Sequence, residues 1–205
     1  IIGFGKRLVD KTKDLDSDAI IYAGKMQSAA KRMQNMIDDL LQYSVASIQG
    51  EPFRLIDLNT VVREVLEDLE TSISEVNGVI HLEGLPIVEA DPAQMRQLFQ
   101  NLISNALKFH KKEQAPKIEL FAKPVRKDSL EINVKDNGIG LGEEHKENIF
   151  QPFFRLHGRS DFEGSGIGLA ICKKIVTRHN GKIEVSCSNE NGSTFKVTLP
   201  VKQSS

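Results

Sequence analysis

Three polar side chains are spaced so that they share one face of the helix predicted over residues 92–111. Asn101, Asn105 and Lys108 stand at positions i, i+4 and i+7, and residues with this spacing are neighbours on a helix surface. Asparagine is a poor helix former, so two of them one turn apart indicate a chemical task. A side-chain carbonyl can ligate Mg²⁺, and the lysine could contact phosphate oxygens. A solvated amide face is the alternative for this helix taken alone.

An acidic residue followed by a glycine turn comes directly after the strand predicted over residues 130–135. Asp136 opens the segment Asp-Asn-Gly-Ile-Gly, in which Gly138 and Gly140 permit positive φ and a close approach to the backbone. A carboxylate in this place can accept a hydrogen bond from an exocyclic amine such as that of adenine. The alternative is an ordinary Asp-Asn-Gly turn between two elements.

A second glycine-rich turn leads into the helix predicted over residues 167–179. Backbone N–H groups at a helix start form an anion site when such a turn precedes them. The glycines at positions 164, 166 and 168 follow the pattern GxGxG, whereas a dinucleotide-binding fold requires GxGxxG after a strand. No P-loop sequence occurs, and the HRD motif of protein kinases with a downstream DFG is also absent.

Aromatic residues are concentrated between the two glycine turns. Phe150, Phe153 and Phe154 lie in a long connection that is typical of a lid anchored by its aromatic side chains. Plain core packing is the alternative for these phenylalanines. Arg155 and Arg159 could neutralise a terminal phosphate, or they could belong to a solvated loop.

These motifs must be positioned by a sheet and its covering helices. Strands are predicted from apolar runs bounded by turn residues, at residues 53–58, 79–83, 117–123, 130–135, 182–188 and 194–199. Helical patterns lie between them at residues 60–74, 92–111 and 167–179. Because strands and helices do not alternate strictly, we predict an α+β fold with helices on one face of a mixed sheet.

The composition is that of an ordinary globular protein. The 205 residues carry 27 Lys and Arg against 28 Asp and Glu, for a formal net charge of -1, so no overall field attracts nucleic acid. No apolar run approaches the roughly 20 residues of a membrane span. The two cysteines lack metal-site spacing and indicate a reducing compartment. We therefore expect a cytoplasmic domain with no membrane segment of its own.

The first quarter of the chain is predicted to be a helical hairpin. A seam of apolar residues with alternating spacings of four and three runs along residues 17–43, at Tyr22, Met26, Ala29, Met33, Met36, Leu40 and Tyr43. A short helix over residues 1–9 precedes it, and two helices cannot close a four-helix core, so we expect a homodimer. The alternative is a hairpin packed on its own globular domain. We predict a hairpin at 1–48, a linker at 49–55 and a catalytic domain at 56–205.

In their order, the polar and glycine-rich motifs resemble those of the catalytic and ATP-binding domain of bacterial sensor histidine kinases. By this resemblance the N box is residues 101–108, the F box is 150–154, and the three glycine boxes are 136–140, 164–168 and 192–194. The resemblance implies a Bergerat-type (GHKL) α/β sandwich. It also identifies the hairpin as the distal part of a dimerisation and histidine-phosphotransfer domain.

The resemblance implies that the domain binds ATP with Mg²⁺. Asn105 would ligate Mg²⁺, while Asn101 and Lys108 would act as the catalytic residues at the phosphates. Asp136 would bind the adenine amine, and the amides of residues 164–168 would hold the phosphate tail. The other cofactor-binding positions implied are Gly138, Gly140, Arg155, Arg159, Gly164, Ser165, Gly166, Gly168, Leu169 and Thr194.

The expected activity is transfer of the γ-phosphoryl group of ATP to a protein histidine, for relay to a response-regulator aspartate. Related ATPases carry a glutamate in the place of Asn101, and an amide cannot act as that base. The chain has no histidine before His81 and begins partway through a helical pattern. We therefore expect the acceptor histidine and a sensory domain upstream, where the full-length protein could be membrane-tethered. The alternatives are a nucleotide-binding module without transfer and a hydrolysing ATPase.

Overall fold

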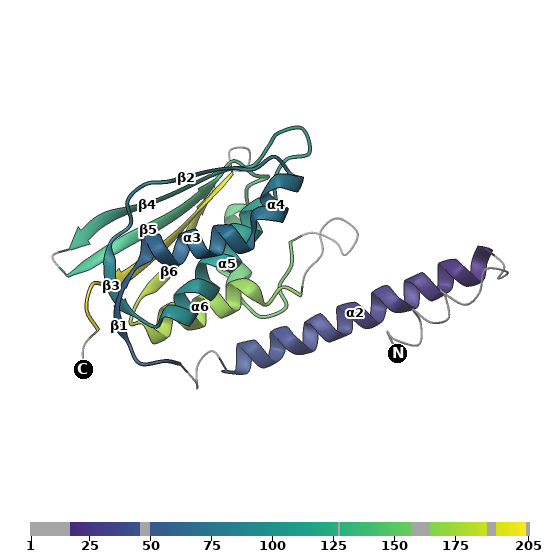
Figure 1. Ribbon diagram of the computed structural model, residues 1–205, viewed down its shortest axis with the longest axis horizontal. Coiled ribbons are helices and arrows are strands. Elements are labelled where there is room, and N and C mark those ends of the chain that lie inside the picture. The colour runs from purple at the N-terminus through teal and green to yellow at the C-terminus, as the bar shows by residue number, and fades with distance from the viewer. Residues whose placement is uncertain (1–16, 46–49, 127, 157–164, 188–191, 204–205) are drawn as a thin grey trace. The chain divides into compact units, whose positions relative to one another are not determined.

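The computed structural model describes residues 17–45, 50–126, 128–156, 165–187 and 192–203 (Figure 1). The chain divides into two compact units, Ile1–Gln42 and Tyr43–Ser205. The predicted long helix is α2, Ser17–Val45, of which all but the last three residues belong to the first unit. Large apolar side chains along it are exposed in the single chain, among them Tyr22, Met26, Met33, Met36 and Leu40. The helix predicted over residues 1–9 lies outside the described residues.

The second unit contains two sheets. The larger has the strand order β2-β4-β5-β7-β6, and the bounds are β2 Val79–Leu82, β4 Lys117–Arg126, β5 Ser129–Asp136, β7 Ser193–Pro200 and β6 Lys182–Cys187. β2 pairs with β4 in parallel, whereas the other three pairings are antiparallel. The sheet is therefore mixed, as the sequence predicts.

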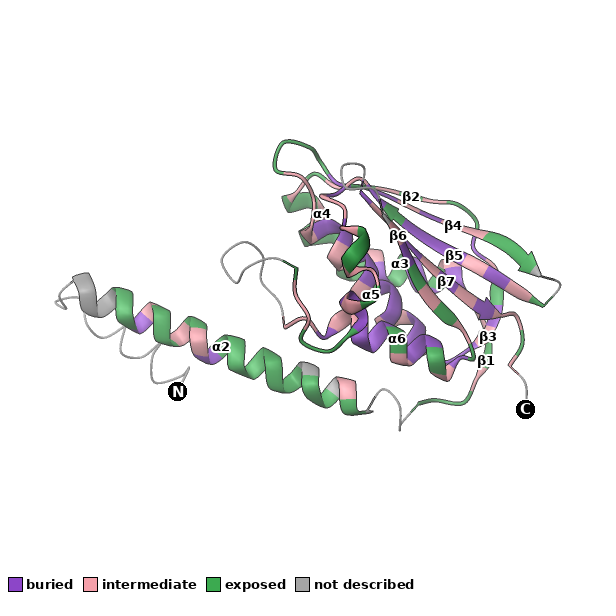
Figure 2. Cartoon of the chain, turned by 180° about the vertical axis from the view of Figure 1, so that it is seen from behind, coloured by how far each residue is buried: buried purple, intermediate pink, exposed green. Residues whose placement is uncertain are grey.

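The helices cover one face of this sheet, as Figure 1 shows for α3 (Leu58–Asp68), α5 (Pro92–Lys108) and α6 (Gly168–Arg178). Strand alternation explains the burial on β5, where Leu130, Ile132 and Val134 are buried and point to the helical side. Phe99 of α5 and Ile175 of α6 are buried against them in one apolar core, which Figure 2 shows in purple. The predicted α+β fold is confirmed.

The structure corrects two predicted elements. A strand missing from the sequence prediction, β3 (Ile87–Ala90), pairs with β1 (Arg54–Asp57) in a separate two-stranded antiparallel sheet. The single helix predicted over residues 60–74 is two helices, α3 and the short α4 (Glu70–Glu75). α3 begins early because Asp57, the last residue of β1, caps it by accepting a hydrogen bond from the Asn59 N–H at 2.9 Å.

The long connection between the two predicted glycine turns contains two short helices. They are the 3₁₀ helices η1 (Glu143–His145) and η2 (Asn148–Phe150). Within the described residues, no helix is both long enough and apolar enough to cross a membrane.

α5 and α6 are joined by a buried polar cluster. Asp91 Oδ1 caps α5 by accepting from the Gln94 N–H at 3.1 Å, and Asp91 Oδ2 accepts from Arg178 Nη1 at 2.9 Å. His179 Nε2 accepts from the Asp91 N–H at 3.0 Å. The other ring nitrogen, Nδ1, lies 2.7 Å from the carbonyl oxygen of Ile175, so the neutral imidazole can donate there. The start of α5 is thereby fixed to the end of α6.

We predict that His179 makes folding stability pH-dependent. Burial lowers the pKa of His179 below its ordinary value of 6.5, so between these two pKa values the unfolded chain binds more protons than the folded one. Stability should therefore be complete above about pH 7 and fall as the pH drops through 6.5. Urea unfolding from pH 7.5 to 5.5 measures this loss. The slope should shrink in His179→Gln, and an equal slope in both proteins would contradict the assignment.

Candidate functional site

α5 has one face in the core and another that carries the predicted stripe. Met95, Leu98 and Leu102 are fully buried, whereas Asn101, Asn105 and Lys108 are each half-buried. The Nδ2 atom of Asn101 is buried and has no hydrogen-bond partner at ordinary distance in the described part of the chain, where the buried thiol of Cys172 is a weakly interacting polar neighbour of the Asn101 side chain. An unsatisfied buried amide donor is costly, so this nitrogen indicates a position where a ligand acceptor is expected.

The predicted acidic turn begins at the end of β5, with Asp136 buried and fixed by backbone donors. Its Oδ1 accepts from the Gly138 N–H at 2.8 Å and from the Ser193 N–H at 3.2 Å. Both hydrogen bonds that the described residues give this carboxylate go to Oδ1, so Oδ2 can serve a ligand. Burial raises the pKa of Asp136, and the two backbone hydrogen bonds partly offset this shift.

Close backbone packing holds this turn against two other segments. A Cβ on Gly138 would lie 2.5 Å from the carbonyl oxygen of Phe109, the residue that follows α5. That same oxygen accepts from the Ile139 N–H at 3.0 Å. Gly192 has φ +83°, and a Cβ there would lie 1.9 Å from the Asp136 carbonyl oxygen. Glycine at these positions allows the first and third glycine boxes and the end of α5 to meet.

The second glycine turn leaves the start of α6 without a side-chain cap. The residue before the helix is Ile167, which supplies no capping hydrogen bond, and Ser165 Oγ accepts from the Ile167 N–H at 3.3 Å. Gly166 has φ +78°, and its carbonyl oxygen accepts from the Phe153 N–H at 3.0 Å. The first N–H groups of an uncapped helix are donors suited to an anion.

The two halves of the site meet where α6 begins. A Cβ on Gly168 would lie 3.3 Å from Asn101 Oδ1, so the amide of α5 is next to the first turn of α6. At the other end of the stripe, Lys108 is followed by Phe109, whose carbonyl oxygen binds the Asp136 turn. Residues 101 and 108 are about 10 Å apart along a helix. The polar stripe therefore runs between the uncapped start of α6 and a buried carboxylate.

Some predicted residues are not brought to this group. Thr194 pairs with Lys135 and Ser186 in the sheet, so alternation places it on the face opposite to Asp136. The neighbouring Ser193 is the residue of β7 that contacts Asp136, through its backbone N–H. The sequence signal for this register is the apolar Phe195, two residues after Ser193, which is buried. Arg159 and Gly164 lie outside the described residues.

The other positions of the predicted cofactor set lie in or beside the three glycine turns. Arg155 and Leu169 are half-buried, and Arg155 packs close to Gly166, since a Cβ there would lie 3.1 Å from Arg155 Cγ. Gly140 has φ +73°, which glycine adopts without strain.

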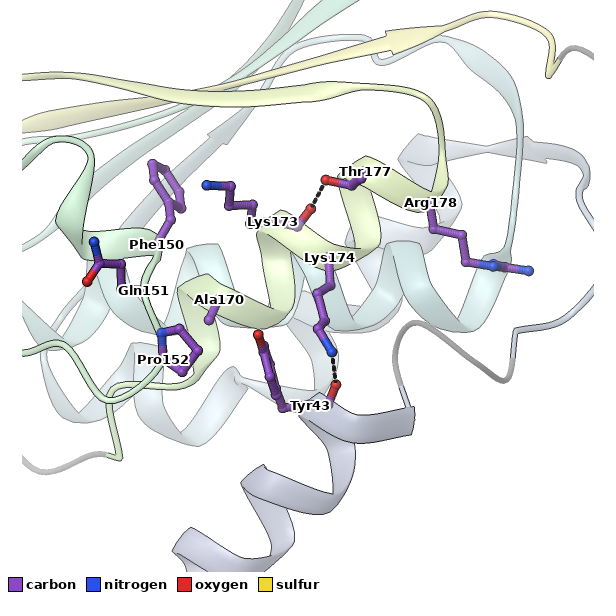
Figure 3. A pocket seen from close by; sticks show the side chains of 9 residues that line it. All are labelled: Tyr43, Phe150, Gln151, Pro152, Ala170, Lys173, Lys174, Thr177 and Arg178. Atoms are coloured by element: carbon purple, nitrogen blue, oxygen red, sulfur yellow. Dashed lines mark hydrogen bonds between the residues drawn. The ribbon is translucent and has the colours of Figure 1, made fainter.

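The predicted aromatic anchors differ in burial. Phe150 is buried, whereas Phe153 is 50% exposed and has φ +65°. Phe150 lines a cavity of about 570 Å³, together with Tyr43, Gln151, Pro152, Ala170, Lys173, Lys174, Thr177 and Arg178 (Figure 3). All of these residues belong to the second unit, which begins at Tyr43. The α6 residues that line the cavity come after the glycine-rich start of the helix, and it is this start that faces Asn101. The cavity is therefore distinct from the polar stripe.

The donor set fits a magnesium nucleotide. Amide oxygens such as that of Asn105 are ligands that Mg²⁺ accepts, and the N–H groups at the start of α6 suit phosphates. The carboxylate of Asp136 suits an amine. A bound phosphate at the start of α6 would also give the Nδ2 atom of Asn101 an acceptor, which that atom lacks among the described residues.

Comparison with known proteins identifies a family. Residues 90–203 match the model described as "Histidine kinase-, DNA gyrase B-, and HSP90-like ATPase". Cyanobacterial phytochrome A of Nostoc sp. (strain PCC 7120) is 40% identical over 187 residues, which are 91% of this chain and 24% of that protein. The chain thus spans about a quarter of this curated relative's length.

Solved structures agree with the family match. The catalytic domain of histidine kinase ThkA is 30% identical, with a TM-score of 0.63, and the match covers 75% of this chain and all of that one. The complex of ThkA with response regulator protein TrrA contains a chain that is 27% identical, with a TM-score of 0.68. That match covers 98% of this chain and 56% of the other.

We predict that Gly192→Ala disrupts the Asp136 turn. A methyl group at a position with φ +83° and 1.9 Å from a carbonyl oxygen forces the backbone apart, at a cost of about 1 to 3 kcal/mol. Urea unfolding should show this loss of stability. Gly84→Ala is the matched control, because a Cβ at Gly84 meets nothing within 4 Å. Equal stabilities of the two variants would refute the close packing.

Proposed function

Because the chain belongs to the family of histidine kinase-, DNA gyrase B- and HSP90-like ATPases, we propose that it is the kinase core of a two-component sensor. It binds Mg²⁺ and ATP and transfers the γ-phosphoryl group to a histidine on a dimerisation helix, for relay to an aspartate of a response regulator. The observation that carries this proposal is the polar stripe of α5, which runs from the uncapped start of α6 to the Asp136 turn.

Each end of the stripe binds one part of the nucleotide. Asp136, whose Oδ1 is held by two backbone donors, presents Oδ2 to the amine of adenine. The N–H groups at the start of α6 bind the phosphates. Asn101 donates from its buried Nδ2 to a phosphate oxygen, and this contact satisfies the atom that lacks a partner in the described structure.

The rest of the stripe, with Asn105 in its middle and Lys108 at the end of α5, completes the phosphate site. Asn105 supplies an oxygen ligand to Mg²⁺, and Lys108 contributes positive charge near the phosphates. When bound, Mg²⁺ neutralises the charge of the phosphate oxygens. The protein's contribution is then to position the γ-phosphoryl group and keep its donors fixed, which supplies most of the catalysis in phosphoryl transfer.

Transfer is favoured over hydrolysis by the side chain at position 101. An amide cannot accept a proton from water as a carboxylate does, so Asn101 binds without activating a nucleophile. Cys172 of α6 is a titratable residue that interacts with the Asn101 side chain, so its protonation state decides whether it could act as a base. Burial raises its pKa to about 12, so the thiol stays protonated and is no base at neutral pH.

The helical hairpin supplies the dimer contact. The apolar residues exposed along α2, including Met26, Met33 and Leu40, follow the spacing of a bundle seam. A second copy of the hairpin would cover them and complete a four-helix core. The response-regulator partner is supported by the similarity to histidine kinase ThkA, whose complex with TrrA is among the matching structures.

We predict that Asp136→Asn weakens ATP binding. The amide replaces a charged acceptor and turns an N–H donor toward adenine, so a charge-assisted hydrogen bond of about 1.5 to 3 kcal/mol is lost. Isothermal titration should show a roughly 10- to 150-fold higher Kd. Glu119→Gln is the matched control, because Glu119 pairs with Lys135 on the opposite face of the same sheet. Unchanged affinity in Asp136→Asn would mean that the carboxylate does not contact the base.

We predict phosphotransfer in a chain extended upstream to include the acceptor histidine. Incubation with γ-labelled ATP and Mg²⁺ should give a protein-bound phosphate that is labile to acid and stable to alkali. Asn105→Ala should abolish the label, and Thr194→Ala should retain it, since Thr194 lies on the far face of the sheet. A folded, ATP-binding extended protein without label would overturn the kinase assignment. Steady phosphate release without label would favour a hydrolase.

A further inference from the structure

The segment that enters the second unit is fixed to the end of α6 by one arginine. Arg178 Nη2 donates to the carbonyl oxygen of Glu51 at 3.0 Å, and the guanidinium lies 4.6 Å from the centre of the Phe53 ring. The same ring is 4.8 Å from the imidazole of His179. We call residues 50–53 the linker strap.

At its first position, Gly50, the strap approaches Arg178 so closely that a larger residue would contact the guanidinium. A Cβ built on Gly50 would lie 2.1 Å from Arg178 Cζ and 2.3 Å from each of its terminal nitrogens. Any side chain at residue 50 must therefore displace the guanidinium or the strap. A single glycine thus controls whether the strap and the arginine can be in contact.

Arg178 also binds the start of α5. Its Nη1 donates to Asp91 Oδ2 and to Gln94 Oε1, both at 2.9 Å, so it binds the cap and the first turn of α5. The Asp91 side chain is fully buried, while that of Arg178 is 24% exposed. Since water weakens a partly exposed ion pair, the strap strengthens the Arg178–Asp91 pair by covering the guanidinium.

The helices joined here also meet at the nucleotide site. From residue 91 to 101 on α5, and from 178 back to 168 on α6, the distance along the helix is about 15 Å in each case. The anchor near Asp91 and the contact between Asn101 and Gly168 are thus at opposite ends of α6, which packs against the first ten residues of α5 in the antiparallel direction. A change of helix alignment at the anchor displaces the amide relative to the start of α6.

We propose that the linker strap is a latch on the α5–α6 pair, and that its docking on Arg178 sets the alignment of the helix ends that bind ATP. This inference rests on the proposed function, since it concerns regulation of the same nucleotide site. Arg178 is a positioning residue in this scheme. Movement of the hairpin that pulls on the strap weakens nucleotide binding, and bound nucleotide in turn strengthens docking of the strap, because coupling between two sites is reciprocal.

The first test perturbs the latch from the linker side in the full 205-residue chain. Gly50→Val should raise the Kd for ATP by about fivefold or more, the lower range of known couplings between sites, when measured by isothermal titration with Mg²⁺ present. Gly84→Val is the matched control, since a Cβ at Gly84 meets nothing within 4 Å, and it should bind ATP as the unmodified chain does.

The second test asks whether strap and arginine act together. Arg178→Lys keeps the charge but loses the planar fork that bridges the strap and α5, so it should weaken ATP binding by a similar factor. The double variant Gly50→Val/Arg178→Lys should be no weaker than either single variant. Independent, multiplying effects would show that the two residues act on ATP binding separately and would overturn the latch.

The third test measures the reverse coupling, which a purely structural contact does not produce. Saturating ATP should slow hydrogen exchange of the amides of residues 51 and 53–55 in the unmodified chain, and this protection should be lost in Arg178→Lys. This readout also decides the matter if Gly50→Val does not fold. Failure of the unmodified chain to bind ATP would refute the proposed function instead. Normal ATP binding with no change in strap exchange would refute the latch alone.

Discussion

The packing of α5 against α6 is the contact on which the rest of the structure depends. α5 contributes fully buried side chains to the core and the polar stripe to the site. Its orientation about its own axis must therefore be fixed. Small residues on α6 make this possible. Gly168 leaves room for the Asn101 amide, and one turn on the buried thiol of Cys172 lies 3.9 Å from the Leu98 carbonyl oxygen. A larger side chain at either position would separate the helices and move the stripe.

The groups proposed to bind the phosphates are mainly neutral, so a phosphate site is compatible with the formal net charge of -1. Backbone N–H groups and side-chain amides are donors whose position is fixed by the fold, and they need no excess of lysine or arginine. Some charges instead pair locally on the sheet, as Lys135 does with Glu119 at 3.1 Å and Lys182 with Glu184 at 2.8 Å. Such pairs contribute little stability, and they leave the helical side free for apolar packing and the site.

Local patterns predict much of this arrangement, and long-range pairing accounts for what they miss. The helical period of α5 and the alternation in β5 are visible in the sequence, and the structure confirms both elements. β3 is not visible, because it has four residues and is a strand only through its pairing with β1, more than thirty residues earlier. Thr194 was placed by motif, whereas the register of β7 puts Ser193 beside Asp136. The contact between the strap and α6 could likewise not be predicted, because no local sequence pattern near Arg178 indicates its hydrogen bond to the distant Glu51.

Among the three helices that cover the sheet, α3, α5 and α6, the capping residues explain why the start of α6 suits an anion and the other two do not. α3 and α5 both begin at an aspartate whose carboxylate accepts a backbone N–H of the first turn, at Asp57 and Asp91. A carboxylate in that place satisfies the donors and repels a phosphate. α6 begins after Ile167, which offers no acceptor, so its first N–H groups require a ligand or water. Of these three helices, the capping residues therefore leave α6, whose start faces Asn101, as the one suited to the proposed phosphate site.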